Sequence, residues 1–159
     1  MISGIVFAVL VMAAAATGAL FPPGPWYEAL RKPHWTPPNW MFPVVWMVLY
    51  VAIAAAGWLA WQAAGWSVLM LLWGAQLVFN AAWSWLFFGL RRMHLALLDV
   101  SLLILSVLAF VVVAQPVSPT ASLLFLPYLA WVIVAGALNL RVLQMNPMEA
   151  RGPASTAKT

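Results

Sequence analysis

Long apolar segments alternate with short polar ones along most of the chain. A helix needs about 20 residues to cross a hydrocarbon core about 30 Å thick, and five segments are long enough. The apolar runs are continuous and lack the alternation of apolar and polar residues that a membrane β-barrel requires, so helices are expected. The sequence therefore predicts an all-α integral membrane protein, a bundle of five transmembrane helices at residues 2–20, 44–64, 68–90, 95–114 and 122–140.

Composition excludes two other classes of protein. Charged residues make up 6% of the 159 residues and hydrophobic residues 66%, whereas an ordinary soluble domain has about 25% charged residues. A soluble globular domain is therefore excluded, and so is a disordered chain, which combines low hydrophobicity with high net charge. There is no cysteine, so disulfides and thiolate metal sites are excluded as well. The net charge of +4 comes from dispersed cations rather than a basic stripe, so no nucleic-acid partner is expected.

The positions of the cations predict how the bundle is oriented. Cytoplasmic loops of membrane proteins are enriched in Lys and Arg. With five transmembrane segments, all seven Lys and Arg residues fall on one side, in the first loop, the third loop and the C-terminal end. These residues are Arg31, Lys32, Arg91, Arg92, Arg141, Arg151 and Lys158. We therefore expect a multi-pass protein of the bacterial cell envelope, with its N-terminus outside and its C-terminus in the cytoplasm.

A single transmembrane domain is expected over residues 1–149. The last residues, 150–159, are small and polar and indicate a flexible C-terminal tail. The first apolar segment could alternatively be a secretory signal, because residues 13–19 are rich in small side chains. A signal peptide begins with positive charges, which are missing here, so a retained transmembrane helix is favoured.

The first loop, residues 21–43, is unusually long for a helical bundle. It contains seven of the 12 prolines, which oppose a continuous helix, although residues 26–32 could form one or two helical turns. It also carries Tyr27, Trp26, Trp35 and Trp40. These aromatic residues could form an interfacial belt, as in many membrane proteins. The favoured interpretation is an ordered lid over the cytoplasmic mouth of the bundle.

Two polar and aromatic stripes are expected inside the bundle. Amide side chains in hydrocarbon need partners, so these faces should point inward. In the simpler interpretation the amides only hydrogen-bond neighbouring helices. Together, however, the stripes resemble a pocket lining of apolar walls with a few polar groups. The first stripe has helical spacing and consists of Gln76, Asn80, Trp83 and Phe87, and the second consists of Tyr128, Trp131, Ala135, Leu138 and Asn139.

Asp99 is the only charged residue within the predicted segments. An ionisable group at that depth indicates a functional site. An ion pair with Arg92, or extension of the side chain to the nearby interface, are equally open alternatives. Small residues at spacings of four, Ala52, Ala56 and Ala60, indicate close helix packing or a dimer seam.

Four stretches carry a resemblance to a known family: WYEALRKPHWTPPNW, FPVVWMVLY, QLVFNAAWSWLFFG and LPYLAWVIVAGALN. In this order they resemble the translocator protein / tryptophan-rich sensory protein family, also called peripheral-type benzodiazepine receptors. The resemblance extends from Trp26 to Asn139. Two positions depart from animal relatives: Leu95 stands near Asp99 where they have an aromatic residue, and Leu140 replaces the central tyrosine of their cholesterol motif.

The resemblance implies a five-helix bundle, usually a homodimer, with a ligand pocket closed by the first loop. The implied ligands are porphyrins such as protoporphyrin IX, haem, sterols, and benzodiazepine- or isoquinoline-type drugs. Together with the stripes and Asp99, it gives the following ligand-binding residues: Trp26, Lys32, Trp35, Trp46, Tyr50, Gln76, Asn80, Trp83, Phe87, Asp99, Tyr128, Trp131, Ala135 and Leu138.

Three functions follow as hypotheses, in order of preference. The first is a membrane receptor or sensory protein that binds porphyrins and regulates their level or signalling. The second is a light- and oxygen-dependent enzyme that degrades porphyrin, with Trp46 and Trp131 as participants. The third is a transporter of porphyrin or sterol, although no inverted repeat is visible. No cofactor is required and no metal is expected, because His34 and His94 lie near the membrane surface.

Overall fold

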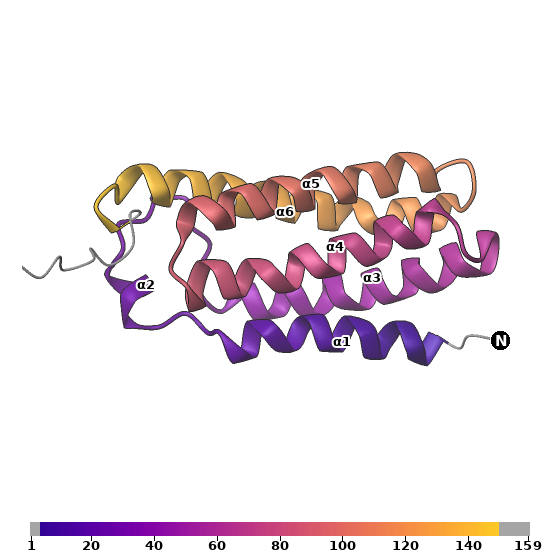
Figure 1. The fold of residues 1–159 in the computed structure, drawn as a ribbon, viewed down its shortest axis with the longest axis horizontal. Coiled ribbons are helices and arrows are strands. Elements are labelled where there is room, and N and C mark those ends of the chain that lie inside the picture. The colour runs from indigo at the N-terminus through magenta and orange to yellow at the C-terminus, as the bar shows by residue number, and fades with distance from the viewer. Residues whose placement is uncertain (1–3, 150–159) are drawn as a thin grey trace, which may run out of the picture.

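The computed structural model describes residues 4–149, which are helical without any strand. Four helices are long and apolar enough to cross a membrane, and a fifth apolar helix, α1, is shorter, with 17 residues. The long helices run side by side as one bundle (Figure 1). The elements are α1 (Gly4–Leu20), α2 (Pro25–Ala29), α3 (Met41–Ala64), α4 (Val68–Ser84), the π-helix η1 (Trp85–Gly89), α5 (Met93–Ala114) and α6 (Pro119–Met145).

The helix ends differ from the expected ones by a few residues. Helix α3 begins at Met41 rather than at residue 44, so Pro43 lies in its first turn, where a proline removes no helical hydrogen bond. Helix α6 continues to Met145, five residues beyond the expected end. Its last turns carry exposed Arg141 and Gln144, which hydrogen-bond each other at 2.9 Å. The segment expected to form one or two helical turns, residues 26–32, contains only the short helix α2.

The bundle core forms where α6 packs against α3 and α5, while α1 packs against α3 and α4. The rings of Phe110 and Phe125 stack at 4.0 Å between α5 and α6. Trp73 of α4 joins three helices, because its ring meets Phe7 of α1 edge-on at 5.0 Å and its Nε1 donates to the Ile53 carbonyl of α3 at 2.9 Å. The Trp73 indole lies directly over Gly57, where only a glycine leaves room for it.

The outer faces of the helices are apolar. Val51, Leu71, Leu105 and Leu123 are each at least 60% exposed, although a soluble protein rarely exposes large apolar patches. Helices satisfy their own backbone hydrogen bonds, so such faces suit contact with lipid. The outer surface therefore agrees with an integral membrane protein.

Helix α4 does not end as a regular α-helix. In η1 the Leu90 amide donates to the Trp85 carbonyl at 2.8 Å, a step of five residues instead of four. The Arg92 amide then reaches the Leu86 carbonyl at 2.9 Å, and Arg91 adopts a left-handed φ of 55°. The expected continuous helix to residue 90 therefore closes with one wide turn, which carries Trp85, Phe87 and Phe88.

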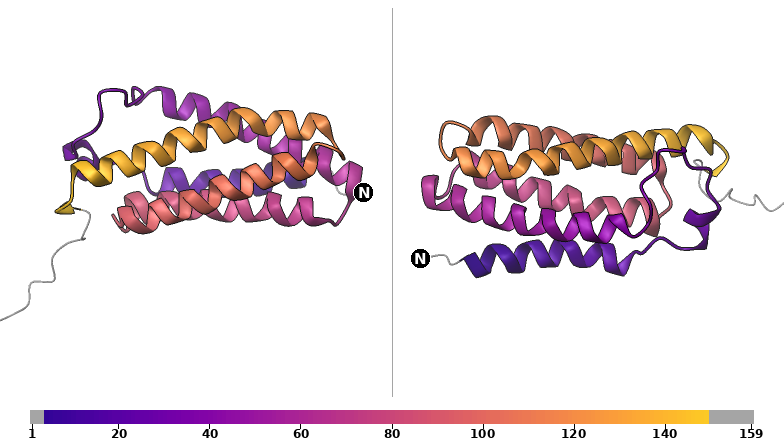
Figure 2. Two further views of the ribbon diagram at one scale, coloured as in Figure 1. Left: turned by 90° about the horizontal axis from the view of Figure 1, so that it is seen from above. Right: turned by 180° about the vertical axis from the view of Figure 1, so that it is seen from behind.

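The segment between α1 and α3, residues 21–40, runs across one end of the bundle, which we call the loop end. Figure 2 shows this α1–α3 connection beside the last turns of α6, while the described chain begins at the opposite end. The η1–α5 turn also lies at the loop end (Figure 1). The described cations therefore belong to segments that meet at one end of the bundle. Arg151, Lys158 and the predicted tail lie outside the described residues.

Candidate ligand-binding site

A hydrogen-bonded network connects α3, α4 and α6 inside the bundle. The Tyr128 hydroxyl is its centre: it donates to Gln76 Oε1 at 2.9 Å and accepts from Asn80 Nδ2 at 3.2 Å. Asn80 Oδ1 in turn accepts from the Tyr50 hydroxyl at 3.1 Å. Gln76 and Tyr128 are fully buried. Both predicted stripes therefore face the interior and contact each other there through their polar groups.

Indole and phenol rings extend this network towards the loop end. Trp46 stacks on Tyr50 with ring centroids 5.2 Å apart and a 27° tilt, and it meets Tyr128 edge-on at 6.1 Å. Trp131 of α6 meets Phe42 of α3 edge-on at 5.6 Å. Trp46 and Trp131 are half-buried. The site thus combines apolar aromatic walls with the buried polar side chains of Gln76, Asn80 and Tyr128.

A second polar contact lies nearer the loop end. Trp83 Nε1 donates to Asn139 Oδ1 at 3.2 Å, and Asn139 Nδ2 donates to the Met93 carbonyl at 3.1 Å. The Trp83 ring stacks on Phe87 at 5.1 Å with a 20° tilt. This contact joins α4, η1, α5 and α6 at one place, so a change in Trp83 affects several elements together.

The α1–α3 connection packs on the aromatic residues of η1. The rings of Trp26 and Tyr27 meet Phe87 edge-on at 6.0 and 6.1 Å, and Tyr27 also meets Phe88 at 5.4 Å. Leu30 is buried in the same cluster. Burial also raises the pKa of the Tyr27 hydroxyl above its ordinary value. We call these five residues the aromatic seat.

The end of α6 holds the connection from the other side. Asn146 Oδ1 accepts from the Arg31 backbone amide at 3.0 Å, and Asn146 Nδ2 donates to the Arg31 carbonyl at 2.9 Å. Trp26 Nε1 also donates to Glu149 Oε2 at 3.3 Å. One asparagine therefore satisfies both backbone groups of Arg31, which lies 115 residues away in the chain.

Two cations of the loop end lie on the same aromatic residues. Lys32 Nζ lies 4.5 Å from the centre of the Tyr27 ring and donates to the Glu28 and Leu30 carbonyls at 3.1 and 3.2 Å. The Arg91 guanidinium lies 5.7 Å from the centre of the Trp26 ring. Both positive charges are therefore at the loop end rather than in the interior of the bundle.

The structure separates the sequence-predicted residues into four groups. The interior group is Trp46, Tyr50, Gln76, Asn80, Trp83, Tyr128, Trp131, Ala135 and Leu138, on α3, α4 and α6. Trp26 and Phe87 belong to the aromatic seat, and Lys32 lies beside it. Trp35 is 41% exposed in the connection. Asp99 lines a separate groove on α5 with residues of η1 and α5.

Sequence reasoning missed several residues that shape the site. Asn146 and Phe42 were not singled out, and Phe88 was not separated from the apolar residues around it. Nothing in the local sequence distinguishes Asn146, because its role depends on the distant backbone of Arg31. Phe42 directly precedes Pro43, which suggested a loop residue rather than a residue of α3.

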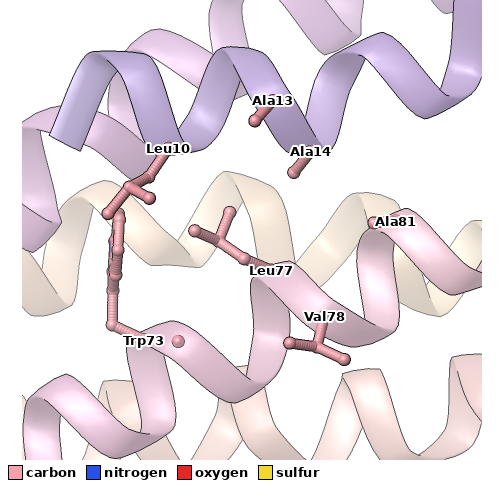
Figure 3. Close-up of a pocket in the computed structure, with 8 residues that line it drawn as sticks. Leu10, Ala13, Ala14, Trp73, Leu77, Val78 and Ala81 are labelled. Carbon is pink, nitrogen blue, oxygen red and sulfur yellow. The ribbon is translucent and has the colours of Figure 1, made fainter. Parts of the chain in front are cut away.

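An apolar groove of about 390 Å³ lies between α1 and α4, outside the predicted site. Figure 3 shows Leu10, Ala13 and Ala14 of α1 facing the labelled side chains of α4. Small residues on α1 leave this space open. Its lining consists of Leu10, Ala13, Ala14, Trp73, Gly74, Leu77, Val78 and Ala81.

The fold and the site together define a helical integral membrane protein with an amide and aromatic interior. The sequence model described as the TspO/MBR family matches residues 5–145. The chain belongs to the TspO/MBR family.

Named relatives extend this family membership from bacteria to mammals. "Protein CrtK" of Rhodobacter capsulatus is 44% identical over 148 residues, which are 91% of this chain and 92% of the relative. The "Tryptophan-rich sensory protein" of Cereibacter sphaeroides is 39% identical over 134 residues, 84% of this chain and 85% of the relative. The "Translocator protein" of Bos taurus is 39% identical over 132 residues, 80% of this chain and 78% of the relative.

Proposed function

We propose that this protein is a membrane receptor or sensory protein that binds a porphyrin among α3, α4 and α6, beneath the α1–α3 connection. One observation carries the proposal: Tyr50, Gln76, Asn80 and Tyr128 form a single polar network among aromatic rings in an otherwise apolar bundle. Ligand pockets combine apolar and aromatic walls with a few placed polar groups in this way. The name of the relative from Cereibacter sphaeroides, "Tryptophan-rich sensory protein", agrees with a sensory role.

The chemistry of a porphyrin matches both parts of the site. A porphyrin is a flat apolar disc with two propionates on one edge. Its faces can stack on Trp46, Trp83 and Trp131, at about 0.5–1.5 kcal/mol per aromatic pair beyond area burial. Its propionates can pair with Lys32 and Arg91, the cations beside the aromatic seat.

Entry requires the loop end to open, because side chains fill the interior in this structure. The Trp83 ring stacks on Phe87, which belongs to the aromatic seat and also contacts Trp26 of the connection. We propose that the connection lifts, this pair separates, and the porphyrin replaces the contacts between the rings. Protoporphyrin IX is thus a ligand rather than a required cofactor, and sterols or benzodiazepine- and isoquinoline-type compounds would compete for the same space.

Replacement of Trp83 tests the proposal. We expect Trp83→Ala to weaken protoporphyrin IX binding by about 1–3 kcal/mol, as for the loss of one large aromatic contact. The measurement is quenching of tryptophan fluorescence by protoporphyrin IX in detergent. Trp58→Ala is the matched control, because Trp58 packs beside Gly4 and lies outside the site. Equal losses in both variants would mean general destabilisation and would contradict the proposed site.

A photochemical enzyme is the second candidate function. The observation that favours it is the Trp46 indole stacked on Tyr50, whose hydroxyl donates to Asn80. Oxidisable rings whose phenol is held by a hydrogen-bond acceptor suit light-driven oxidation of a bound porphyrin by oxygen. Loss of the porphyrin absorbance bands should then need light and oxygen and should slow in Trp46→Phe and Trp131→Phe. Fast loss in darkness, or identical loss without protein, would exclude this activity.

We also propose that the bundle spans the bacterial envelope membrane five times, with α1 as a span, as a homodimer with its loop end in the cytoplasm. The described cations Arg31, Lys32, Arg91, Arg92 and Arg141 belong to segments that meet at that end, which is the arrangement of cytoplasmic loops. A reporter fused after the last residue should be active in the cytoplasm, and a reporter before the first residue outside it. Both reporters in one compartment would contradict the five-span topology, and a monomer in lipid nanodiscs would contradict the dimer.

A further inference from the structure

A second cavity lies between η1 and α5 and shares no residue with the hydrogen-bonded network. It encloses about 210 Å³, and its lining consists of Leu86, Leu95, Leu98, Asp99 and Leu102. The four α5 residues have spacings of three and four, so they share one face of the helix. Leu95, Leu98 and Leu102 are 41–59% exposed. The groove therefore opens on the apolar outer surface, where lipid can reach it.

Asp99 is the only polar side chain in this groove, and it is 8% exposed. Its Oδ2 atom is buried and has no hydrogen-bond partner among the described residues. The ion pair with Arg92 considered from the sequence is not formed within residues 4–149, and Arg92 is exposed. Nothing in the described chain therefore compensates this carboxyl group.

An uncompensated carboxyl group in hydrocarbon is unfavourable, and such groups in membrane helices mark ligand or ion pathways. The missing partner has to carry a positive charge or a hydrogen-bond donor. The leucines around Asp99 cannot hydrogen-bond to a polar headgroup, but they can pack against an alkyl chain. A molecule with a cationic N–H head and an apolar body supplies both the charge and the donor.

We propose that this groove binds a lipid-soluble ammonium compound, with the protonated nitrogen at the Asp99 carboxylate and the alkyl body along the leucines. Asp99 lies six residues after the first residue of α5, about 9 Å along the helix axis. Leu102 lies one turn deeper, so an alkyl chain that continues past Asp99 follows the groove towards the membrane centre. An N–H group on the ammonium supplies a charge-assisted hydrogen bond to the Asp99 carboxylate.

The first experiment uses the full chain in nanodiscs of phosphatidylcholine. The probe is N,N-dimethyldodecylamine, which is protonated at neutral pH, and dodecanol is the neutral amphiphile of the same chain length. We expect the amine, and not the alcohol, to raise the thermal unfolding midpoint of the natural chain. Asp99→Asn should remove this rise. Glu28→Gln removes a carboxylate from the exposed α2 and should keep the rise.

A second measurement needs no variant and so remains decisive if Asp99→Asn does not fold. Dicyclohexylcarbodiimide modifies carboxyl groups that it reaches from the membrane, and peptide mass spectrometry locates the adduct. We expect the amine to slow modification of Asp99 at least about fivefold relative to dodecanol, a difference of about 1 kcal/mol in binding. Porphyrin binding is not part of either readout, so the proposed function can fail while this proposal stands.

Several results would overturn the ammonium site. Equal protection by amine and alcohol would show that only the apolar walls bind, and no protection by either would show that the groove binds neither. An absence of any adduct at Asp99 would mean that the carboxyl group is closed to the membrane. A thermal shift that persists in Asp99→Asn, or disappears in Glu28→Gln, would assign the effect to general surface charge.

Discussion

The middle of the bundle and its loop end are held together by different kinds of contact. In the middle, Tyr128, Gln76 and Asn80 bond to one another across helices, deep in the core. At the loop end, Asn146 hydrogen-bonds to the backbone of Arg31. The rings of the aromatic seat add edge-on contacts, such as that of Trp26 with Phe87. The middle is buried, whereas the hydrogen bonds of Asn146 to Arg31 lie at the exposed surface.

This difference implies that the two regions open with different free energies. Breaking the network leaves buried polar groups without partners in a medium that supplies none. Breaking the contacts of Asn146 exposes groups that water can solvate at once. Local opening in proteins starts from such weakly held regions. The loop end should therefore open while the middle stays intact, which is what entry of a ligand requires.

The largest effect is expected where the middle is packed most closely. Gly57→Ala places a methyl group within the Trp73 indole and 2.9 Å from Phe7 Cδ1. Overpacking of this kind costs about 1–3 kcal/mol of unfolding free energy. Gly74→Ala is the matched control on the neighbouring helix, since nothing lies within 4 Å of its added carbon. Thermal unfolding in nanodiscs measures both, and equal midpoints would contradict the close packing at Trp73.

The hydrogen-bonded centre gives the next effect. Tyr128→Phe leaves Gln76 Oε1 and Asn80 Nδ2 without a partner, and we expect a loss of about 1–2 kcal/mol. Tyr27→Phe makes the same chemical change in the aromatic seat, where the hydroxyl has no hydrogen bond to a described residue. It should cost less than about 0.5 kcal/mol. If both variants unfold at the same temperature, the contrast between the two regions is wrong.

Asn146→Ala should loosen the loop end alone. We expect the amides of residues 25–35 to exchange with solvent about fivefold faster, which corresponds to about 1 kcal/mol of local opening. The amides of α3 and α5 should keep their protection. Hydrogen exchange followed by mass spectrometry resolves these segments. Faster exchange throughout the bundle would show that the connection and the core open together.

Alkaline pH should loosen the aromatic seat through Tyr27. Burial favours the neutral hydroxyl and raises its pKa above 10.0. The stability that the neutral Tyr27 hydroxyl contributes is complete below the pKa of the unfolded state, about 10. It is lost as the pH rises through the higher pKa of the folded state. The protection of residues 25–35 from exchange, relative to an unfolded chain at the same pH, should therefore fall above about pH 10, and less so in Tyr27→Phe. Identical pH profiles would exclude Tyr27 as the cause.

The smallest effect is expected for Glu149→Ala. Its contact with Trp26 Nε1 is 3.3 Å long and exposed, so we expect a change below about 0.5 kcal/mol. A thermal unfolding curve that overlays that of the natural chain is the expected result. A shift as large as that of Tyr128→Phe would mean that the loop end stabilises the whole bundle.

Apolar segment length predicted the positions of the long helices, because each helix is apolar on its outer face and needs no partner to be recognised. Helical spacing likewise predicted that Gln76 and Asn80 share an inward face, since amides in hydrocarbon need partners. The exact helix ends were not predictable, because Pro43 is compatible with both a loop and a first helical turn.

Contacts between distant segments could not be predicted from local patterns. The bonds of Asn146 to Arg31 and of Tyr128 to two residues of α4 depend on how the helices pack. Whether Asp99 forms an ion pair with Arg92 could not be decided either, since the two residues are close in sequence but Arg92 precedes α5 and points to the surface side. Helical spacing predicts on which face of a helix a residue lies, but not which residue of another helix or loop it contacts.

The π-helix η1 has a consequence for how this chain tolerates changes of length. Its wide turn contains one residue more than an α-helical turn, so the ring directions of Phe87 and Phe88 relative to α4 depend on that extra residue. Removing one residue from 85–89 would let α4 finish as a regular α-helix, but everything after the deletion would rotate by about 100° around the helix axis. Trp26 and Tyr27 would then lose their contacts with Phe87 and Phe88, while the helix itself became more regular. The π-helical turn, rather than any single side chain, therefore fixes the rotation of the loop-end residues around the helix axis relative to α4.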